Sequence, residues 1–153
     1  MRKITLIKHA KGAPGLRMFG LGPNLIPCKG LEKLKNLLNQ NTLWAKNRKL
    51  DELKICLSKS DVIISLWLDD QILGFGRALS DGIYRGVLWD IVIHKDYQGE
   101  GFGKLIVNCL LKSKEIKKTE KIYLMTTNQK DFYTKFNFQE VKSQNLLIKE
   151  ISN

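Results

Sequence analysis

Cysteine, histidine and proline are scarce in this chain of 153 residues, which has 3 cysteines, 2 histidines and 3 prolines. Cys28, Cys56 and Cys109 are odd in number and lack C-x-x-C spacing, which excludes a disulfide framework and makes a zinc cluster improbable. Such cysteines are typical of reduced thiols in a cytosolic-type compartment. No apolar stretch reaches the roughly 18 residues of a membrane-spanning helix, and the N-terminus lacks the apolar run of a secretory signal. We therefore expect a cytoplasmic protein with no membrane partner.

Acidic residues are also few, with 15 Asp and Glu against 26 Lys and Arg and a formal net charge of +11. A basic excess can indicate a nucleic acid or another acidic partner. Of these basic residues, however, 21 are Lys and only 5 are Arg, and they are spread along the chain without interleaved aromatic residues. A lysine-rich surface caused by coding bias is therefore favoured over a nucleic-acid-binding face.

The length and the hydrophobic fraction of 43% predict one globular domain over residues 1–153. All three prolines and five of the 12 glycines fall within the first 30 residues. Proline blocks helix interiors and glycine favours turns, so residues 1–30 are predicted to be a loop-rich segment. A short strand is expected near Leu16–Leu21.

Beyond residue 30 the spacing of apolar residues predicts a mixed α/β fold. Helical spacing predicts four helices, at Leu31–Leu38, Leu50–Leu57, Phe102–Lys118 and Asp131–Phe136. Runs rich in β-branched residues predict strands at Val62–Leu68, Gln71–Leu79, Gly86–Ile93, Ile122–Met125, Phe138–Val141 and Leu146–Ile151. The strand at Gly86–Ile93 is apolar at nearly every position, which indicates a central place in the sheet.

The most informative segment joins this central strand to the long helix, and it reads Gln98-Gly99-Glu100-Gly101-Phe102-Gly103. Glycines let the backbone curl so that several N–H groups point at one spot. The helix that follows adds unpaired N–H groups and the positive end of its dipole. The junction therefore predicts a site for a phosphate group.

Two nucleotide-binding motifs do not fit this turn. A Walker loop needs Lys-Ser or Lys-Thr after its last glycine, whereas Gly103 is followed by Lys104-Leu105. The dinucleotide fingerprint needs G-x-G-x-x-G after the first strand of a βαβ unit, whereas these glycines are spaced G-x-G-x-G.

Two blocks within residues 30–142 instead resemble the GNAT N-acetyltransferase superfamily. The first reads Leu88-Trp89-Asp90-Ile91-Val92-Ile93-His94-Lys95-Asp96-Tyr97-Gln98-Gly99-Glu100-Gly101-Phe102-Gly103-Lys104, in which Gln-x-x-Gly-x-Gly follows a hydrophobic strand as in the family's acetyl-CoA loop. The second, Asp131-Phe132-Tyr133-Thr134-Lys135-Phe136-Asn137-Phe138, is similar to the family's F-Y-x-x-x-G-F segment. The Trp-Asp strand, the turn Ala78-Leu79-Ser80-Asp81 and the Asp-Phe-Tyr triplet look most like the cyanobacterial and plastid branch, which includes chloroplast serotonin and protein-lysine N-acetyltransferases.

The resemblance implies the GNAT fold, in which helices flank a splayed and mostly antiparallel sheet, and acetyl-CoA as co-substrate with no metal. Backbone N–H groups of the turn would hold the pyrophosphate, and strand backbone would pair with the pantetheine amides. One strand N–H would stabilise the thioester oxygen as it gains charge, an effect typically worth about 2.7–4 kcal/mol. The implied cofactor-binding residues are Ile91, Val92, Ile93, Gln98, Gly99, Glu100, Gly101, Phe102, Gly103, Lys104, Asn128 and Phe132.

Two residues are expected to be catalytic, Tyr133 by the same resemblance and Asp90 as the only carboxylate of the central strand. Tyr133 would protonate the departing thiolate, although a core aromatic residue is the alternative. Asp90 would be the general base or bind the substrate amine, although a structural strand carboxylate is the alternative. Asp131 is expected to be a helix N-cap, and His94 a loop residue. The three tryptophans are expected in the core or in a pocket wall.

The chain departs from the branch at several positions. Asn137 replaces the usual glycine, which is mild because Asn tolerates the left-handed conformation. Residues 126–130 and 145–150 also differ from the branch in regions that help line the acceptor side, so serotonin-like specificity does not carry over. The acceptor is left as a primary amine, either a small arylalkylamine or a peptidyl lysine or N-terminus, which attacks the thioester directly.

A second class of function stays open at this point. A basic, non-enzymatic module that binds CoA or RNA and keeps the fold is the alternative to an enzyme. The resemblance also adds the plastid stroma as a location, and the sequence leaves a homodimer open.

Overall fold

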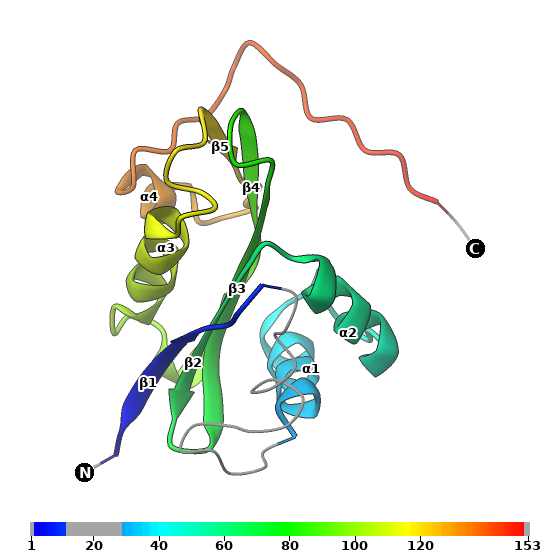
Figure 1. Ribbon diagram of the computed structural model, residues 1–153, viewed down its shortest axis with the longest axis vertical. Helices are drawn as coiled ribbons and strands as arrows, with labels where there is room; N and C mark the ends of the chain where they lie inside the picture. The colour runs from blue at the N-terminus through cyan, green and yellow to red at the C-terminus, as the bar shows by residue number, and fades with distance from the viewer. Residues whose placement is uncertain (1, 12–28, 152–153) are drawn as a thin grey trace.

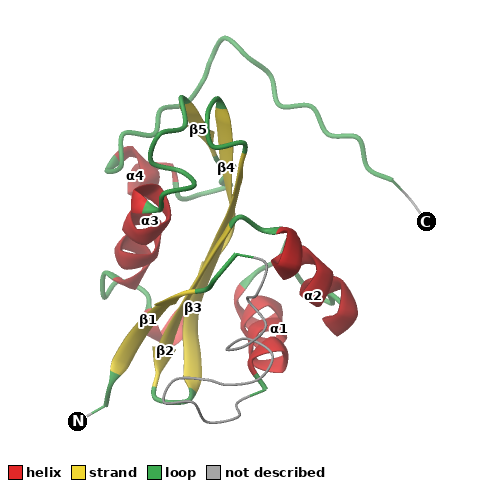
Figure 2. Ribbon diagram, in the orientation of Figure 1, coloured by secondary structure: helices red, strands yellow, loops and turns green. Residues whose placement is uncertain are grey.

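The computed structural model describes residues 2–11 and 29–151. Its centre is a five-stranded sheet in the order β1-β2-β3-β4-β5, in which β4 and β5 are the parallel pair. Helices lie on both faces of this sheet (Figure 1), and the rest of the described chain is loop and turn (Figure 2). The strands are β1 Ile4–Lys8, β2 Val62–Leu68, β3 Gln71–Ser80, β4 Arg85–Ile93 and β5 Lys121–Tyr123. The helices are α1 Gly30–Asn41, α2 Leu50–Lys59, α3 Phe102–Lys112 and α4 Lys130–Thr134, with a 3₁₀ turn, η3, at Lys95–Tyr97.

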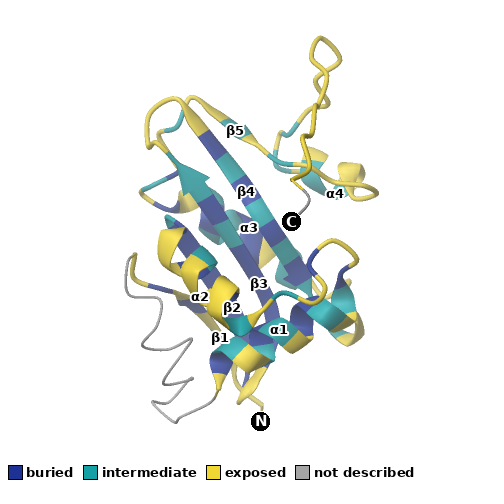
Figure 3. Cartoon of the chain, turned by 90° about the vertical axis from the view of Figure 1, so that its right-hand side faces the viewer, coloured by how far each residue is buried: buried dark blue, intermediate teal, exposed yellow. Residues whose placement is uncertain are grey.

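The mixed α/β fold predicted from the sequence is confirmed, and its core forms two apolar clusters on the two faces of the sheet. On one face, leucines of α1 and α2 pack against Trp67 and Phe75 of the sheet. On the other face, Ile106 and Leu110 of α3 pack against Leu66 of β2. The three central strands are accordingly the most buried part of the chain (Figure 3). None of the described helices is long and apolar enough to cross a membrane.

The N-terminal loop prediction is wrong at Ile4–Lys8, which forms β1. This strand pairs with β2 in antiparallel register, from Ile4 opposite Leu68 to Lys8 opposite Ile64. The segment Ile-Thr-Leu-Ile-Lys is short, its pairing partner lies about 60 residues away in sequence, and the prolines and glycines that follow it favoured a loop. The strand expected near Leu16–Leu21 lies outside the described residues, and the single domain over 1–153 stays a prediction.

The helix predicted over Phe102–Lys118 ends earlier, at Lys112. Ser113 leaves the helical conformation with ψ 142°, and its hydroxyl donates a hydrogen bond of 2.7 Å to the Cys109 carbonyl. Ile116 remains fully buried in the following turns, where its N–H donates to the Ser113 carbonyl at 3.0 Å. This buried isoleucine extended the apolar spacing beyond the true end of the helix.

The C-terminal strands were predicted in excess. The strand expected at Ile122–Met125 is limited to Lys121–Tyr123 and is partly exposed. The strands expected at Phe138–Val141 and Leu146–Ile151 do not form, and residues 139–151 run away from the sheet with exposed side chains (Figure 3). β-propensity reflects how a side chain fits against strand neighbours, so an apolar run without a partner strand does not become a strand.

Candidate active site

The strand β4 is paired along both edges only at its start. Arg85–Val87 pair with β5, and Gly86–Ile93 pair with β3. Beyond Val87 β5 no longer follows, so the second half of β4 keeps one partner strand. The backbone of Ile91, Val92 and Ile93 lies beside a cavity instead. An extended ligand could add to this open edge as a strand does.

A β-bulge marks the point where β4 becomes open. Phe75 faces Val92 and Arg77 faces Trp89, so two residues of β4, Asp90 and Ile91, lie opposite the single residue Gly76. Asp90 takes the left-handed conformation with φ 53°. The extra residue shifts the alternation of side chains, because Leu88 and Ile91, three positions apart, both belong to the cluster on the α3 face. Bulges of this kind bend a strand away from its neighbours.

A cavity of about 1020 Å³ lies along the open half of β4. Its lining joins this strand, the glycine turn, the segment around α4 and the segment from the end of α1 toward α2. Of the residues predicted from the sequence, it brings together Ile91, Val92, Ile93, Gln98, Gly99, Gly101, Gly103, Lys104, Asn128, Phe132 and Tyr133. Asp90, Glu100 and Phe102 do not line it, and Phe102 packs against the core on the α3 face instead.

The turn that closes one end of this cavity depends on its glycines for conformation. Gly99 and Gly101 have φ of 82° and 87°, with no atom within 4 Å of where a Cβ would lie, so glycine is needed there for its backbone angles. Gly101 is the N-cap of α3 and offers no side-chain cap, so the first N–H groups of this helix are left for a ligand. The Gln98 side chain donates a hydrogen bond of 3.1 Å to the Ile93 carbonyl, which ties the turn to β4.

The third glycine of the turn fits α3 closely against α4. A Cβ on Gly103 would lie 3.2 Å from the Phe132 ring, closer than most Cβ contacts. Phe132 in turn makes edge-to-face contacts with Tyr133 and Phe136, at ring-centroid distances of 4.9 and 5.4 Å. This aromatic cluster fixes Tyr133 in the cavity wall.

Among the titratable side chains that line the cavity, Tyr133 has the pKa that its surroundings shift most. Burial raises the pKa of its hydroxyl to about 12. The hydroxyl therefore stays protonated through the neutral and moderately alkaline range. It forms no hydrogen bond with the described residues, so it is open to a ligand in the cavity.

Asp90 is held by two arginines. Arg48 donates two hydrogen bonds, of 2.9 and 3.1 Å, to the two carboxylate oxygens, and the Arg77 Nε donates a third of 2.7 Å. Burial opposes ionisation, but the Arg48 hydrogen bonds and the Arg77 charge outweigh it, so the pKa of Asp90 lies below its usual value. These partners lie 42 and 13 residues away, and no local pattern in the sequence indicated them.

The sequence also gave little sign of the segment between α1 and α2 as a cavity wall. Leu43, Trp44 and Lys46 line the cavity, and the Trp44 side chain is 63% exposed. An exposed tryptophan beside a cavity favours ligand contact, in agreement with the pocket-wall interpretation of this residue. The only available signal was a tryptophan in a short polar connection between two helices.

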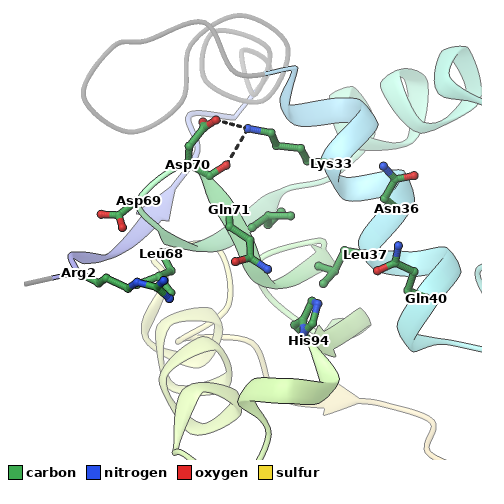
Figure 4. Close-up of a pocket in the computed structure, with 11 residues that line it drawn as sticks. Arg2, Lys33, Asn36, Leu37, Gln40, Leu68, Asp69, Asp70, Gln71 and His94 are labelled. Carbon is green, nitrogen blue, oxygen red and sulfur yellow. Dashed lines mark hydrogen bonds and ion pairs between the residues drawn. The ribbon is translucent and has the colours of Figure 1, made fainter.

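A second cavity, of about 540 Å³, lies between α1 and the β2–β3 turn (Figure 4). Its lining includes Arg2, Lys33, Asp69 and Asp70, and Lys33 forms an ion pair of 2.7 Å with Asp70. His94 lines this cavity and not the larger one, and its Nδ1 accepts a hydrogen bond from the Asp96 N–H. Among the described residues, no group of His, Cys, Asp and Glu side chains could hold a metal ion.

Comparison with known proteins agrees with this geometry. The model of the acetyltransferase (GNAT) domain matches residues 59–140. A protein from the red alga Gracilaria tenuistipitata var. liui, described as an uncharacterized N-acetyltransferase ycf52, is 33% identical over 115 residues, which are 72% of this chain and 60% of the algal protein. The chloroplastic serotonin N-acetyltransferase 2 of Oryza sativa subsp. japonica is 31% identical over 71 residues, which are 42% of this chain and 34% of the rice protein.

A solved structure has the same fold at low sequence identity. The crystal structure of a protein from Xanthomonas campestris pv. campestris, described as belonging to the GNAT family, superposes with a TM-score of 0.76 at 18% identity, covering 99% of this chain and 95% of the other. The chain spans about a third to three fifths of the length of the two relatives above. The domain match covers more than half of the chain and includes β2 to β5, the glycine turn and Tyr133. The chain therefore belongs to the GNAT family of acetyltransferases.

Proposed function

We propose that the chain transfers an acetyl group from acetyl-CoA to a primary amine, either a small arylalkylamine or a peptidyl lysine or N-terminus. The observation that carries this proposal is the single cavity that joins the open edge of β4, the glycine turn and Tyr133. Acetyl-CoA would supply the activated acyl group, and the residues of this chain would bind it, orient it and manage the protons. The chloroplastic name of the Oryza sativa relative supports the plastid stroma, beside the cytoplasm, as the proposed location.

The residues fit acetyl-CoA on two physical grounds. The free N–H groups at the start of α3, next to two left-handed glycines, form a concave donor surface of the kind that binds a pyrophosphate. On the edge away from β3, the backbone of Ile91–Ile93 lacks a partner strand and can pair with the two amides of an extended pantetheine arm. We assign Lys104, in the first turn of α3, to the phosphate charge, and Asn128 and Phe132 to the opposite wall.

Tyr133 is the proposed donor to the leaving sulfur. Its pKa of about 12 keeps the proton available at every pH at which the enzyme would work. Complete transfer from so weak an acid to a thiolate of ordinary pKa, about 8.5, would run uphill. We therefore assign Tyr133 a hydrogen bond that strengthens as negative charge builds on the sulfur, a contribution made only in the transition state.

Asp90 fits a positioning role better than that of a base. Its oxygens are already engaged by Arg48 and Arg77, and a carboxylate with a lowered pKa is a weak proton acceptor. We propose that the cluster holds the bulge, and with it the free N–H groups of β4. The amine would form its bond to the acetyl carbon as the carbon–sulfur bond breaks, and its proton would leave to water.

Acetyl-CoA turnover measured by thiol release against a mixed amine panel tests this function. We expect amine-dependent release that disappears in Gly101→Asp, with CoA binding lost in calorimetry. A protein that binds CoA but releases no thiol with any amine would support the non-enzymatic binding module instead.

A further inference from the structure

The larger cavity is lined by four lysines and by no acidic residue. Lys46, Lys95, Lys104 and Lys135 all contribute to its wall, and none of them forms an ion pair with another described residue. The residues outside the described part of the chain, 1, 12–28 and 152–153, add no Asp or Glu side chain. The cavity is therefore cationic throughout.

This charge is a local property and does not follow from the lysine-rich composition alone. The smaller cavity near the β2–β3 turn is lined by both signs, Arg2 and Lys33 together with Asp69 and Asp70 (Figure 4). Asp90 does not neutralise the larger cavity, since Arg48 and Arg77 already hold its carboxylate.

Two of these lysines lie beside different substrates under the proposed function, one beside acetyl-CoA and one beside the acceptor amine. Lys104 directly follows the glycine turn and faces the phosphates under the proposed function. Lys46 comes from the segment between α1 and α2, which supplies none of the proposed acetyl-CoA contacts. In that segment Lys46 is the charged residue that lines the cavity, next to the exposed side chains of Leu43 and Trp44.

We propose that Lys46 and Trp44 select the acceptor, and that this acceptor is a primary amine carrying an anionic group, such as a carboxylate, beyond a short apolar stretch. The inference rests on the proposed acetyl transfer and names its substrate class. Trp44 would cover the apolar stretch, and the Lys46 ammonium would pair with the anion. In the segment between α1 and α2, an acceptor with a second positive charge would face the like charge of Lys46.

The same charges act on the reacting nitrogen. Cationic neighbours without a compensating carboxylate disfavour an ammonium ion and lower the pKa of a bound amine. The acceptor would therefore lose its proton to water more readily in the cavity than in solution. A site of this kind needs no carboxylate base, which agrees with the engagement of Asp90 by two arginines.

Three acceptors of similar length test the proposal with the full chain and saturating acetyl-CoA. 4-Aminobutyrate, butylamine and 1,4-diaminobutane differ in the charge of the end away from the reacting amine. We expect kcat/KM to fall in that order, by about tenfold from the first to the last, the size expected for one partly screened charge pair. Lys46→Glu should reverse the order, Lys46→Gln should flatten it, and Trp44→Ala should lower all three values together.

Lys118→Glu is the matched control, because it makes the same charge change on the exposed turn after α3. It should leave the order of acceptors unchanged. A wild-type order without an anion preference, or an order kept in Lys46→Glu, overturns the proposal while acetyl transfer itself still stands. A loss of CoA affinity in Lys46→Glu also overturns it, because Lys46 would then belong to the cofactor. Absence of thiol release with all amines counts instead against the proposed function.

Discussion

The two halves of β4 share one strand and differ in what lies beside them. Gly86 and Val87 are paired with strands on both edges, whereas β4 beyond Val87 is paired with β3 alone. The first half of β4 is used only for pairing within the sheet. The second half carries the bulge at Asp90, an open edge and the turn that leads into α3. Chemistry is therefore expected where pairing stops, because free backbone groups are available to a ligand only there.

Of the changes proposed here, Gly101→Asp should have the largest effect, which is a loss of CoA affinity at the turn beyond the open half of β4. The change places a carboxylate in the N–H cradle of α3, and like charges forced together cost several kcal/mol, so CoA affinity should fall at least about 100-fold. Calorimetry measures it. Gly82→Asp is the matched control, because Gly82 has a similar φ of 79° and equally open surroundings in the β3–β4 connection, away from the cavity. Equal losses of affinity in the two variants would show that both changes act by disrupting the fold. The glycine turn would then not be part of the CoA site.

Tyr133→Phe should lower kcat with little change in the KM for acetyl-CoA. The hydroxyl strengthens its hydrogen bond as the sulfur leaves, and loss of a donor that acts in the transition state typically costs about 100-fold or more in kcat. Since its pKa is raised to about 12, wild-type kcat should show no fall from tyrosine ionisation through pH 10. Tyr123→Phe, on the half-exposed edge of β5, is the control and should leave kcat unchanged. A decrease of less than about threefold for Tyr133→Phe would show that thiolate departure needs no help from this residue.

The rate is expected to rise with pH in the alkaline range, because the acceptor amine must lose its proton before it attacks. Asp90→Asn should destabilise the fold and weaken catalysis without removing this rise. It leaves Arg48 and Arg77 facing a neutral amide, at a cost of about 2–4 kcal/mol, below the full value for a buried pair because Arg48 still reaches solvent. Urea unfolding measures the loss. If Asp90→Asn instead abolished the alkaline rise in rate and left stability intact, Asp90 would be the base after all.

The lowered pKa of Asp90 also sets a pH dependence of stability. The folded pKa lies below the unfolded value of about 4, so the stabilisation is complete above that value and is lost as pH falls through the folded pKa. Urea midpoints measured between neutral pH and pH 3 should fall more steeply in the wild type than in Asp90→Asn. Parallel curves would assign the acid sensitivity to other carboxylates.

Removal of the C-terminal tail should have the smallest effect. Residues 142–151 have exposed side chains, so a chain that ends at Val141 should change stability by less than about 0.5 kcal/mol and CoA affinity by less than twofold. Thermal unfolding and calorimetry check this. A loss of more than about 1 kcal/mol would show that the apolar residues of the tail pack against the domain in solution.

The sequence predicted what depends on local patterns. Some elements depend on residues that are close in sequence, and these were placed correctly. They are the helices α1 and α2, the strand β2 and the glycine turn before α3. The resemblance to a known family added Ile91–Ile93 and Tyr133 as one site, and the cavity brings these residues together. The experiments above test whether these residues bind acetyl-CoA and take part in the reaction.

Long-range pairing was the part that the sequence could not show. β1 forms because β2 offers an edge, and Leu146–Ile151 stays extended in solvent although its composition suits a strand. The sequence left Asp90 as either a functional or a structural carboxylate, and only the fold showed that Arg48 and Arg77 hold it. Such contacts depend on partners tens of residues away, which neither propensity nor spacing encodes.

Backbone amide chemical shifts during a CoA titration test the central claim most directly, because they report separately on the two halves of β4. If CoA binds along the open half of β4 and at the glycine turn, the amides of Ile91–Ile93 and Gln98–Lys104 should shift most, with Arg85–Val87 nearly unchanged. Shifts concentrated in Arg85–Val87, or around Lys33 and Asp70 at the smaller cavity, would contradict it.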